Sequence, residues 1–302
     1  MKKLIIILGT VGVSFSAIFV KSSSAPSMVL VLYRVLFATL MLLPFVLLRF
    51  RKELMGLKVS TLIMPIISGI FLGLHFTMYF ESLHYTSIAS SLILVDTEVF
   101  FVAAVMILVW KERISGKAWL GILATFLGSV LVALADLGTG SNMIMGDLLA
   151  FAGAAFMAVY TLFGKQCRKV MSTTVYTFLV YASSTITLLM LTLIKRIPLT
   201  GYENKNYLIG FGLAALCTLC GHSVYSWGLK YEKASFISTA KLLEPVFASG
   251  LGLLIFAEIP SGLVVFGGVI VIGGVFYYSR NSEGKATNQL QTKVLGNEEK
   301  HG

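Results

Sequence analysis

Charged side chains are scarce in this sequence. Asp, Glu, Lys and Arg make up 13% of the 302 residues, whereas 57% are hydrophobic, and the mean hydropathy is +0.86. Soluble domains carry about 25% charged residues, so this chain lacks the charges needed to cover a water-exposed surface. The composition therefore predicts an integral membrane protein whose solvent is the lipid bilayer.

The charges that are present are mostly basic, with 24 Lys and Arg against 14 Asp and Glu. They occur in short clusters between apolar runs, which is typical of residues that set membrane topology. The net charge of +10 therefore does not indicate a nucleic-acid partner.

Cysteine is rare, and the motifs of several enzyme classes are absent. Three cysteines, an odd number, provide no disulfide framework. Cys217 and Cys220 form a CxxC pattern, but His222 lies about 140° around a helix from Cys217, so we favour packing residues over a metal site. The sequence has no P-loop, HExxH or GxSxG motif, which excludes P-loop nucleotide hydrolysis and gives no support to a hydrolase. We expect neither an enzyme nor a cofactor.

Long apolar runs are abundant. A helix needs about 20 apolar residues to cross the bilayer, and ten runs have roughly this length: 3–21, 29–48, 61–82, 88–110, 118–136, 147–165, 174–194, 207–229, 236–256 and 262–279. The first run resembles a signal peptide, because two lysines precede it and Ser22-Ser23-Ser24-Ala25 follows it. Its apolar part is longer than that of a usual signal peptide, so we interpret it as the first membrane helix.

The basic residues between these runs predict the orientation. Eighteen of the 24 Lys and Arg fall on the side that carries both termini, and four fall on the other side. Since cytoplasmic loops carry the excess of Lys and Arg, we expect a multi-pass protein of the cell (cytoplasmic) membrane with both termini cytoplasmic. The loop between the seventh and eighth runs departs from this pattern, because it holds three of the four outer charges.

The sequence repeats itself at an offset of 146 residues, where segment 87–115 matches segment 233–261 without a gap. The pairs that carry most weight are Glu98 with Glu244, Glu112 with Glu258, Gly116 with Gly262, Gly121 with Gly267 and Gly128 with Gly274. This duplication predicts two five-helix repeats, 1–138 and 139–279, followed by a disordered cytoplasmic tail, 280–302. Because five is odd, the second repeat must cross the membrane in the opposite sense.

Inverted repeats are typical of transporters, whose site lies near the membrane midplane between the repeats. The stretches TEVFFVAAVMILVWKERISG and LEPVFASGLGLLIFAEIPSG, with LYRVLFATLMLLP in the second run, resemble the EamA-like transporters of the drug/metabolite transporter superfamily. The resemblance covers residues 4–279. It implies a cavity lined by helices 1, 3, 4, 6, 8 and 9, and export of small metabolites. Val99 stands where this family usually has a proline, which Pro245 retains, so we expect the first copy to lack the kink of the second.

Ionisable residues inside the runs are the first candidates for a site. A charge at membrane depth costs about 2.5–3.5 kcal/mol and normally faces a cavity or a partner. The candidates are Arg34, His75, Glu81, Asp96, Glu98, His222, Lys241 and Glu244. Asp96 and Glu98 point about 200° apart on a helix, so they should not both face one cavity. We favour Glu98, because its repeat mate Glu244 is also acidic.

Several of these charges have a structural alternative. Glu244 follows Lys241 by three residues, and the two could form an ion pair within their helix. Alternatively, Glu98 and Glu244 face each other and share a proton, which would suit proton coupling or an amine. Arg34 could snorkel to the surface or lock helices together. We therefore interpret Arg34, Asp96 and Lys241 as cavity or structural charges.

Two runs present similar polar faces. His75 and Tyr79 lie on one line of the third helix, and His222, Tyr225 and Ser226 share a face of the eighth. A single histidine is usually a packing residue, but two at nearly equivalent repeat positions favour a functional role. We predict that these five residues bind substrate together with Glu98 and Glu244, without a metal.

These features predict a secondary transporter that exports a small polar metabolite, such as an amino acid or amine, by alternating access. Cationic groups at His75, His222 and Lys241 opposite the two glutamates would suit a zwitterion. The alternatives are a passive facilitator or channel on the same fold, and a membrane enzyme or sensor that transports nothing. Glycines on the fifth and tenth helices allow close helix packing and are compatible with a homodimer.

Overall fold

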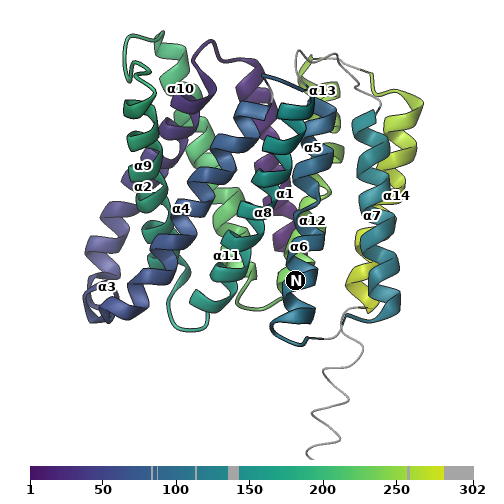
Figure 1. The fold of residues 1–302 in the computed structure, drawn as a ribbon, viewed down its shortest axis with the longest axis horizontal. Coiled ribbons are helices and arrows are strands. Elements are labelled where there is room, and N and C mark those ends of the chain that lie inside the picture. The colour runs from purple at the N-terminus through teal and green to yellow at the C-terminus, as the bar shows by residue number, and fades with distance from the viewer. Residues whose placement is uncertain (83, 87, 113, 135–142, 257–258, 282–302) are drawn as a thin grey trace, which may run out of the picture.

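The computed structural model describes residues 1–82, 84–86, 88–112, 114–134, 143–256 and 259–281, and every regular element in these ranges is a helix (Figure 1). The elements are α1 (Lys2–Lys21), α2 (Ser27–Arg49), α3 (Arg51–Gly56), α4 (Val59–Ser82), α5 (Ile88–Asp96), α6 (Glu98–Leu108), α7 (Gly116–Leu134), α8 (Met143–Cys167), α9 (Thr173–Ile194), α10 (Asn204–Gly212), η1 (Leu213–His222), α11 (Ser223–Gly228), α12 (Ala234–Lys241), α13 (Glu244–Phe256) and α14 (Gly262–Asn281).

The outer surface of this bundle is apolar. Leu48, Leu254 and Ile259 are among many large hydrophobic side chains that point outward, and each is more than 80% exposed. Eight helical stretches of the described chain are long and apolar enough to cross a membrane, and the apolar part of α7, Gly116–Val132, is shorter. The prediction of an all-helical, multi-pass membrane protein is confirmed.

The duplicated segment is broken at the same place in both copies. α6 begins at Glu98 and α13 begins at its repeat mate Glu244, and a short turn separates each from the preceding helix, α5 or α12. The backbone stays in the right-handed helical region at both turns, with φ and ψ of −61° and −10° at Thr97 and −61° and −9° at Leu242.

The prediction that only the second copy is interrupted is therefore wrong. Pro245 lacks an N–H and cannot continue the hydrogen-bond ladder of α12. In the first copy, the Thr97 hydroxyl instead donates to the Leu94 carbonyl and competes with the helical backbone bond. Different side chains thus produce the same break, although Val99 replaces the proline.

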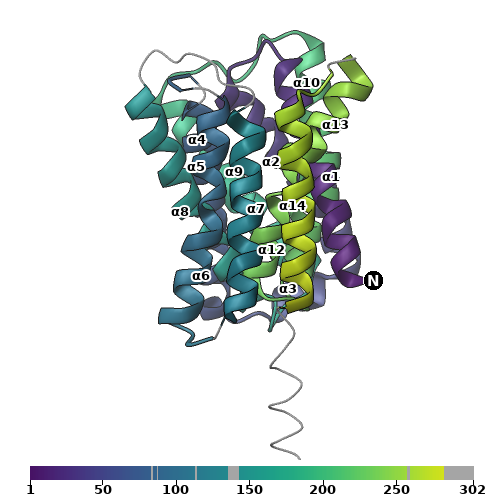
Figure 2. The same cartoon turned by 90° about the vertical axis from the view of Figure 1, so that its right-hand side faces the viewer.

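α7 and α14 lie side by side (Figures 1 and 2), because glycines let their backbones approach. A Cβ atom at Gly128 would lie 2.9 Å from the Gly267 carbonyl oxygen, and one at Gly121 would lie 2.8 Å from the Tyr278 backbone. The predicted close packing of these two helices is confirmed. Since these glycines serve a contact within the chain, they do not argue for a homodimer.

The two ends of the described chain lie at one face of the bundle (Figure 2). The ammonium of Lys3, in α1, donates to the Ser279 carbonyl near the end of α14 at 2.8 Å. The predicted tail lies outside the described residues from position 282, as does Glu258.

The helix formed by the eighth predicted run, 207–229, contains a π-helical segment in its middle. α10 leads into η1, a π-helix of 10 residues that continues as α11. The Thr218 hydroxyl donates to the Leu213 carbonyl five residues earlier, at 3.2 Å. π-helical turns are rare and frequently occur at functional sites, and this one ends at His222.

Candidate functional site

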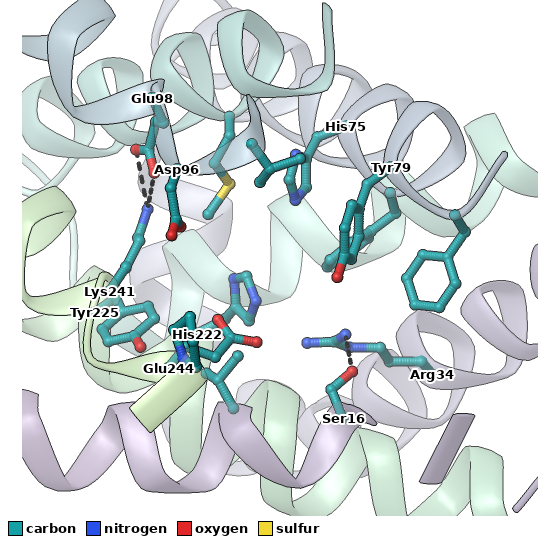
Figure 3. A pocket seen from close by; sticks show the side chains of 16 residues that line it. Ser16, Arg34, His75, Tyr79, Asp96, Glu98, His222, Tyr225, Lys241 and Glu244 are labelled. Carbon is teal, nitrogen blue, oxygen red and sulfur yellow. Dashed lines mark hydrogen bonds and ion pairs between the residues drawn. The ribbon is translucent and has the colours of Figure 1, made fainter. Parts of the chain in front are cut away.

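A cavity of about 70 Å³ lies between the helices (Figure 3). It is lined by Val13, Ser16, Arg34, His75, Phe76, Tyr79, Phe80, Val95, Asp96, Glu98, Met157, His222, Tyr225, Lys241, Glu244 and Pro245. All of these except Arg34 come from the six spans that the family resemblance implies. The volume admits a few water molecules but is smaller than the roughly 300–1,000 Å³ of ligand pockets.

Both acidic residues of the first broken segment line this cavity. The expectation that Asp96 and Glu98 could not share it is wrong, because the turn at Thr97 ends one helix and starts another. The angle of about 200° applies only to a continuous helix. The two carboxylates have different partners: Asp96 Oδ2 accepts a hydrogen bond from the Ser129 hydroxyl at 3.0 Å.

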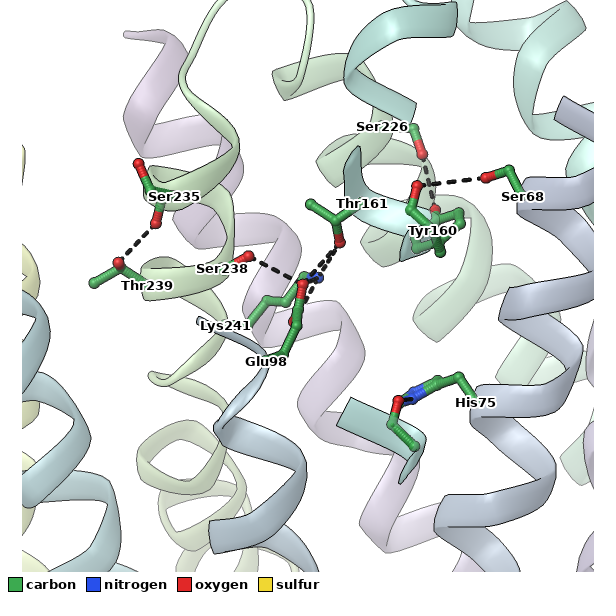
Figure 4. Close-up of polar contacts among 11 residues, drawn as sticks. Ser68, His75, Glu98, Tyr160, Thr161, Ser226, Ser235, Ser238, Thr239 and Lys241 are labelled. Atoms are coloured by element: carbon green, nitrogen blue, oxygen red, sulfur yellow. Dashed lines mark hydrogen bonds and ion pairs between the residues drawn. The ribbon is translucent and has the colours of Figure 1, made fainter. Parts of the chain in front are cut away.

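Glu98 belongs to a closed polar network (Figure 4). Lys241 Nζ lies 3.0 Å from both Glu98 carboxylate oxygens. The hydroxyls of Thr161 and Ser238 donate to Glu98 Oε1 at 2.8 and 3.0 Å. The Glu98 and Lys241 side chains are only 6% and 10% exposed. The network thus holds a neutralised ion pair that joins α6, α8 and α12.

Glu244 lacks such partners. Lys241 pairs with Glu98 rather than with Glu244, so the alternative of an ion pair within the second copy is wrong. No hydrogen bond or ion pair joins the Glu244 carboxylate to another described residue. Figure 3 shows this carboxylate pointing into the cavity, toward the guanidinium of Arg34. The two repeat mates therefore differ: one carboxylate is neutralised, and the other is open.

Arg34 is buried at the cavity, with 2% of its surface exposed, and so does not snorkel. Its Nε donates to the Thr218 hydroxyl at 2.8 Å, and its guanidinium carbon lies 4.5 Å from the centre of the Phe76 ring. Nη1 makes a long contact of 3.5 Å with Ser16. Nη2 is buried without a hydrogen-bond partner in the described chain. A buried polar group normally has a partner, so this nitrogen is a candidate contact for a ligand or a water molecule.

His75 and His222 both line the cavity (Figure 3). His75 Nδ1 lies 2.9 Å from the Gly153 carbonyl, which orients the ring, and Tyr79 stacks on it at an interplanar angle of 8°. His222 is 4% exposed, and its Nδ1 is a second buried atom without a partner. The His222 ring packs edge-on against Tyr225, whose ring also lies 5.6 Å from the Lys241 ammonium.

Two candidates lie elsewhere. Ser226 is absent from the cavity lining, because its hydroxyl lies 3.0 Å from the Tyr160 hydroxyl and donates to the His222 carbonyl. Glu81 pairs with Lys195 at 3.7 Å, away from the cavity. The sequence interpretation missed the hydroxyl groups that complete the site, on Ser16, Thr161, Thr218 and Ser238. Each is a short polar residue in an apolar helix, which is the only signal it carries in the sequence.

Basic side chains at the end of α8 tie it to the segment between α11 and α12. Lys165 Nζ donates to the Leu229 and Glu232 carbonyls at 2.8 and 2.6 Å. Arg168, just beyond α8, donates to the Ser226 carbonyl at 3.2 Å, and burial lowers the pKa of its guanidinium from the ordinary value. This segment lies at the face that carries the chain ends, since Lys2 Nζ is 4.2 Å from the centre of the Tyr231 ring.

The described part of the chain contains no cluster suited to a metal ion. No group of three or more His, Cys, Asp or Glu side chains in the described ranges could hold a metal ion. In the predicted CxxC pattern, Cys217 is buried and Cys220 is exposed, as expected for side chains that do not converge.

Known proteins agree with the fold. The model of the EamA-like transporter family matches residues 2–134 and 144–280. An uncharacterized transporter of Clostridium kluyveri is 26% identical and covers 68% of each chain. The pseudopaline exporter CntI of Pseudomonas aeruginosa is 24% identical over 93% of this chain and 96% of its own. One solved crystal structure has a TM-score of 0.75 at 18% identity, covering 93% of this chain and 98% of that chain, which shows the fold alone.

Proposed function

Because the chain belongs to the EamA-like transporter family, we propose that it is a secondary transporter that exports small polar metabolites, such as amino acids or amines. The observation that carries this proposal is the cavity, where Arg34 Nη2 and His222 Nδ1 are buried without a hydrogen-bond partner in the described chain, and where the Glu244 carboxylate faces Arg34 without an ion pair to it (Figure 3). Unpaired buried polar groups are costly, so they favour a polar ligand over simple packing. The exporter among the relatives supports outward transport.

The proposed architecture has ten membrane helices in two inverted repeats, 1–138 and 139–279. Three observations support it: the match of the family model to two successive segments, the breaks before Glu98 and Glu244, and the adjacent chain ends. Adjacent ends require an even number of crossings. The charge pattern supports cytoplasmic chain ends and a location in the cytoplasmic membrane.

Alternating access requires that one side of the cavity is closed while the other opens. The hydrogen bonds of Lys165 and Arg168 lie at the proposed cytoplasmic face, and the Glu98–Lys241 pair holds α6 to α12 at the cavity wall. We propose that this conformation is closed toward the cytoplasm. Export then requires these contacts to open on that side when a substrate enters.

Proteoliposomes test the function directly. We expect saturable flux of at least one amino acid or amine in an assay that also offers sugars and nucleosides. Coupling to protons predicts accumulation against a gradient that collapses when a protonophore is added. A passive facilitator would instead equilibrate the solute without accumulation. Absence of flux for every solute, with protein shown to be folded by its helical circular dichroism, would refute the proposal.

A further inference from the structure

Apart from Asp96, whose carboxylate accepts a hydrogen bond from Ser129, the Asp, Glu, Lys and Arg side chains that line the cavity form a closed pair and an open pair. Glu98 and Lys241 neutralise each other at 3.0 Å. Arg34 and Glu244 point toward each other across the cavity (Figure 3), but no hydrogen bond or ion pair joins them in the described structure. The open pair is a cationic and an anionic group that both line the cavity.

The duplication explains why one glutamate has a counter-ion and the other does not. Lys241 stands three residues before Glu244 but reaches across to Glu98. At the offset of 146 residues, the counterpart of Lys241 is Val95, three residues before Glu98. By the same symmetry, a lysine at position 95 would reach across to Glu244. Val95 lines the cavity. The space that the ammonium of such a lysine would occupy is therefore part of the cavity.

We propose that the substrate supplies this missing cation. Its primary ammonium binds Glu244 as Lys241 binds Glu98, and a carboxylate of the same molecule binds the free edge of Arg34. The proposal rests on the transport function proposed above and names its substrate class as zwitterions with a primary ammonium. Val95 is then the residue that keeps the binding site open.

The contacts of Lys241 describe what such an ammonium would meet. Its nitrogen lies 3.0 Å from both carboxylate oxygens of Glu98. On the opposite side, the planar guanidinium of Arg34 has the geometry that matches a carboxylate. A simple amine would leave Arg34 unpaired, and a simple acid would leave Glu244 unpaired. Either should bind at least about tenfold more weakly than the zwitterion, since a site built for a polar group rejects analogues that lack it.

The first test measures thermal stabilisation of the purified full-length protein. The probes are the common L-amino acids, with the decarboxylated amine, the deaminated acid and the N-trimethyl derivative of each. We expect at least one amino acid to stabilise the protein at concentrations where its three derivatives do not. Equal stabilisation by the amine or by the N-trimethyl derivative would overturn the proposal, as would stabilisation by none of the amino acids.

The second test fills the site with a tethered ammonium. Val95→Lys should pair with Glu244 and lower amino-acid flux in proteoliposomes at least about tenfold below that of Val95→Met, which adds similar length without charge. Val95→Lys should also unfold at the same temperature as Val95→Met or higher, because its ammonium gains a carboxylate. Equal flux in the two variants would overturn the proposal. If Val95→Lys does not fold, Glu244→Gln takes its place and must lose stabilisation by amino acids.

The outcomes separate this inference from the transport function. If the wild-type protein moves a sugar or a nucleoside but no amino acid, the function stands and the substrate class is wrong. If the wild-type protein moves no solute of any class, the transport function itself is wrong.

Discussion

Replacing Glu98 by glutamine should destabilise the protein by about 3–5 kcal/mol, the usual cost of leaving one partner of a buried ion pair alone. The Lys241 side chain is 10% exposed, so water cannot replace the lost carboxylate. Lys241→Met should cost less, because the Thr161 and Ser238 hydroxyls still donate to Glu98, and hydrogen bonds to charged groups contribute about 1.5–3 kcal/mol each.

The double variant Glu98→Gln/Lys241→Met should recover most of this loss, since replacing a whole buried pair by neutral residues is often close to neutral. The coupling energy between the two sites is then about 3 kcal/mol or more. Equilibrium unfolding of the four proteins in mixed detergent and SDS micelles, followed by circular dichroism, measures it. Losses that add without coupling, or single losses below about 1 kcal/mol, would refute the assignment of a buried, neutralising pair.

The pair of Glu81 with Lys195 provides a matched control. Its atoms are 3.7 Å apart, and the Lys195 and Glu81 side chains are 46% and 32% exposed. Exposed ion pairs contribute about 0–1 kcal/mol, so Glu81→Gln should leave the unfolding free energy nearly unchanged in the same assay.

Three further predictions concern the open site and the scaffold. Glu244→Gln should leave the unfolding free energy within about 1 kcal/mol of wild type, because the change breaks no ion pair of the kind that joins Glu98 to Lys241, yet abolish proteoliposome flux; wild-type flux would contradict this. Arg34→Lys keeps the charge but loses the planar fork that bonds Thr218, so flux should fall at least about tenfold, and unchanged flux would exclude a role for the guanidinium. Gly128→Leu should destabilise the protein by about 1–3 kcal/mol or more through overpacking, whereas Gly273→Leu, whose Cβ would meet nothing within 4 Å, should not; equal melting temperatures would contradict the α7–α14 contact.

The fold class and the family could be predicted from the sequence because they depend on its charge content, the length of its apolar runs and the spacing of its matched residues. The scarcity of charge excludes a soluble surface, and apolar runs of membrane length leave few alternatives to helices. The matched spacing of Glu98 and Glu244 predicts a duplication. Neither inference requires knowledge of which helices touch.

The breaks in the duplicated helices required the structure. The run 88–110 is apolar enough for one continuous helix, and Thr97 is not a strong helix breaker. The turn there is compatible with the surrounding contacts, since Glu98 just beyond it accepts hydrogen bonds from α8 and α12. Helical angles measured across the turn were therefore misleading, and they excluded Asp96 from a cavity that it lines.

The ion-pair partner of Lys241 could not be predicted from its spacing to neighbouring residues either. Residues three apart on a helix are neighbours, which favoured Lys241 with Glu244. In the structure, Lys241 instead pairs with Glu98, which is 143 residues away in the sequence. Ser226 shares a helical face with His222 by spacing, yet its hydroxyl is engaged by Tyr160.

The difference between the two copies therefore carries more functional information than their similarity. Two identical copies would place either two neutralised carboxylates or two open ones at the cavity. With Lys241 in one copy and Val95 in the other, one glutamate contributes to a fixed cross-link and the other stays available. A cavity that must bind and release a charged solute needs both, because the cross-link offsets the cost of burying charge while the open carboxylate leaves the solute an unmatched partner. This asymmetry is the physical reason to expect opposite outcomes for Glu98→Gln, which should lose stability, and Glu244→Gln, which should lose transport.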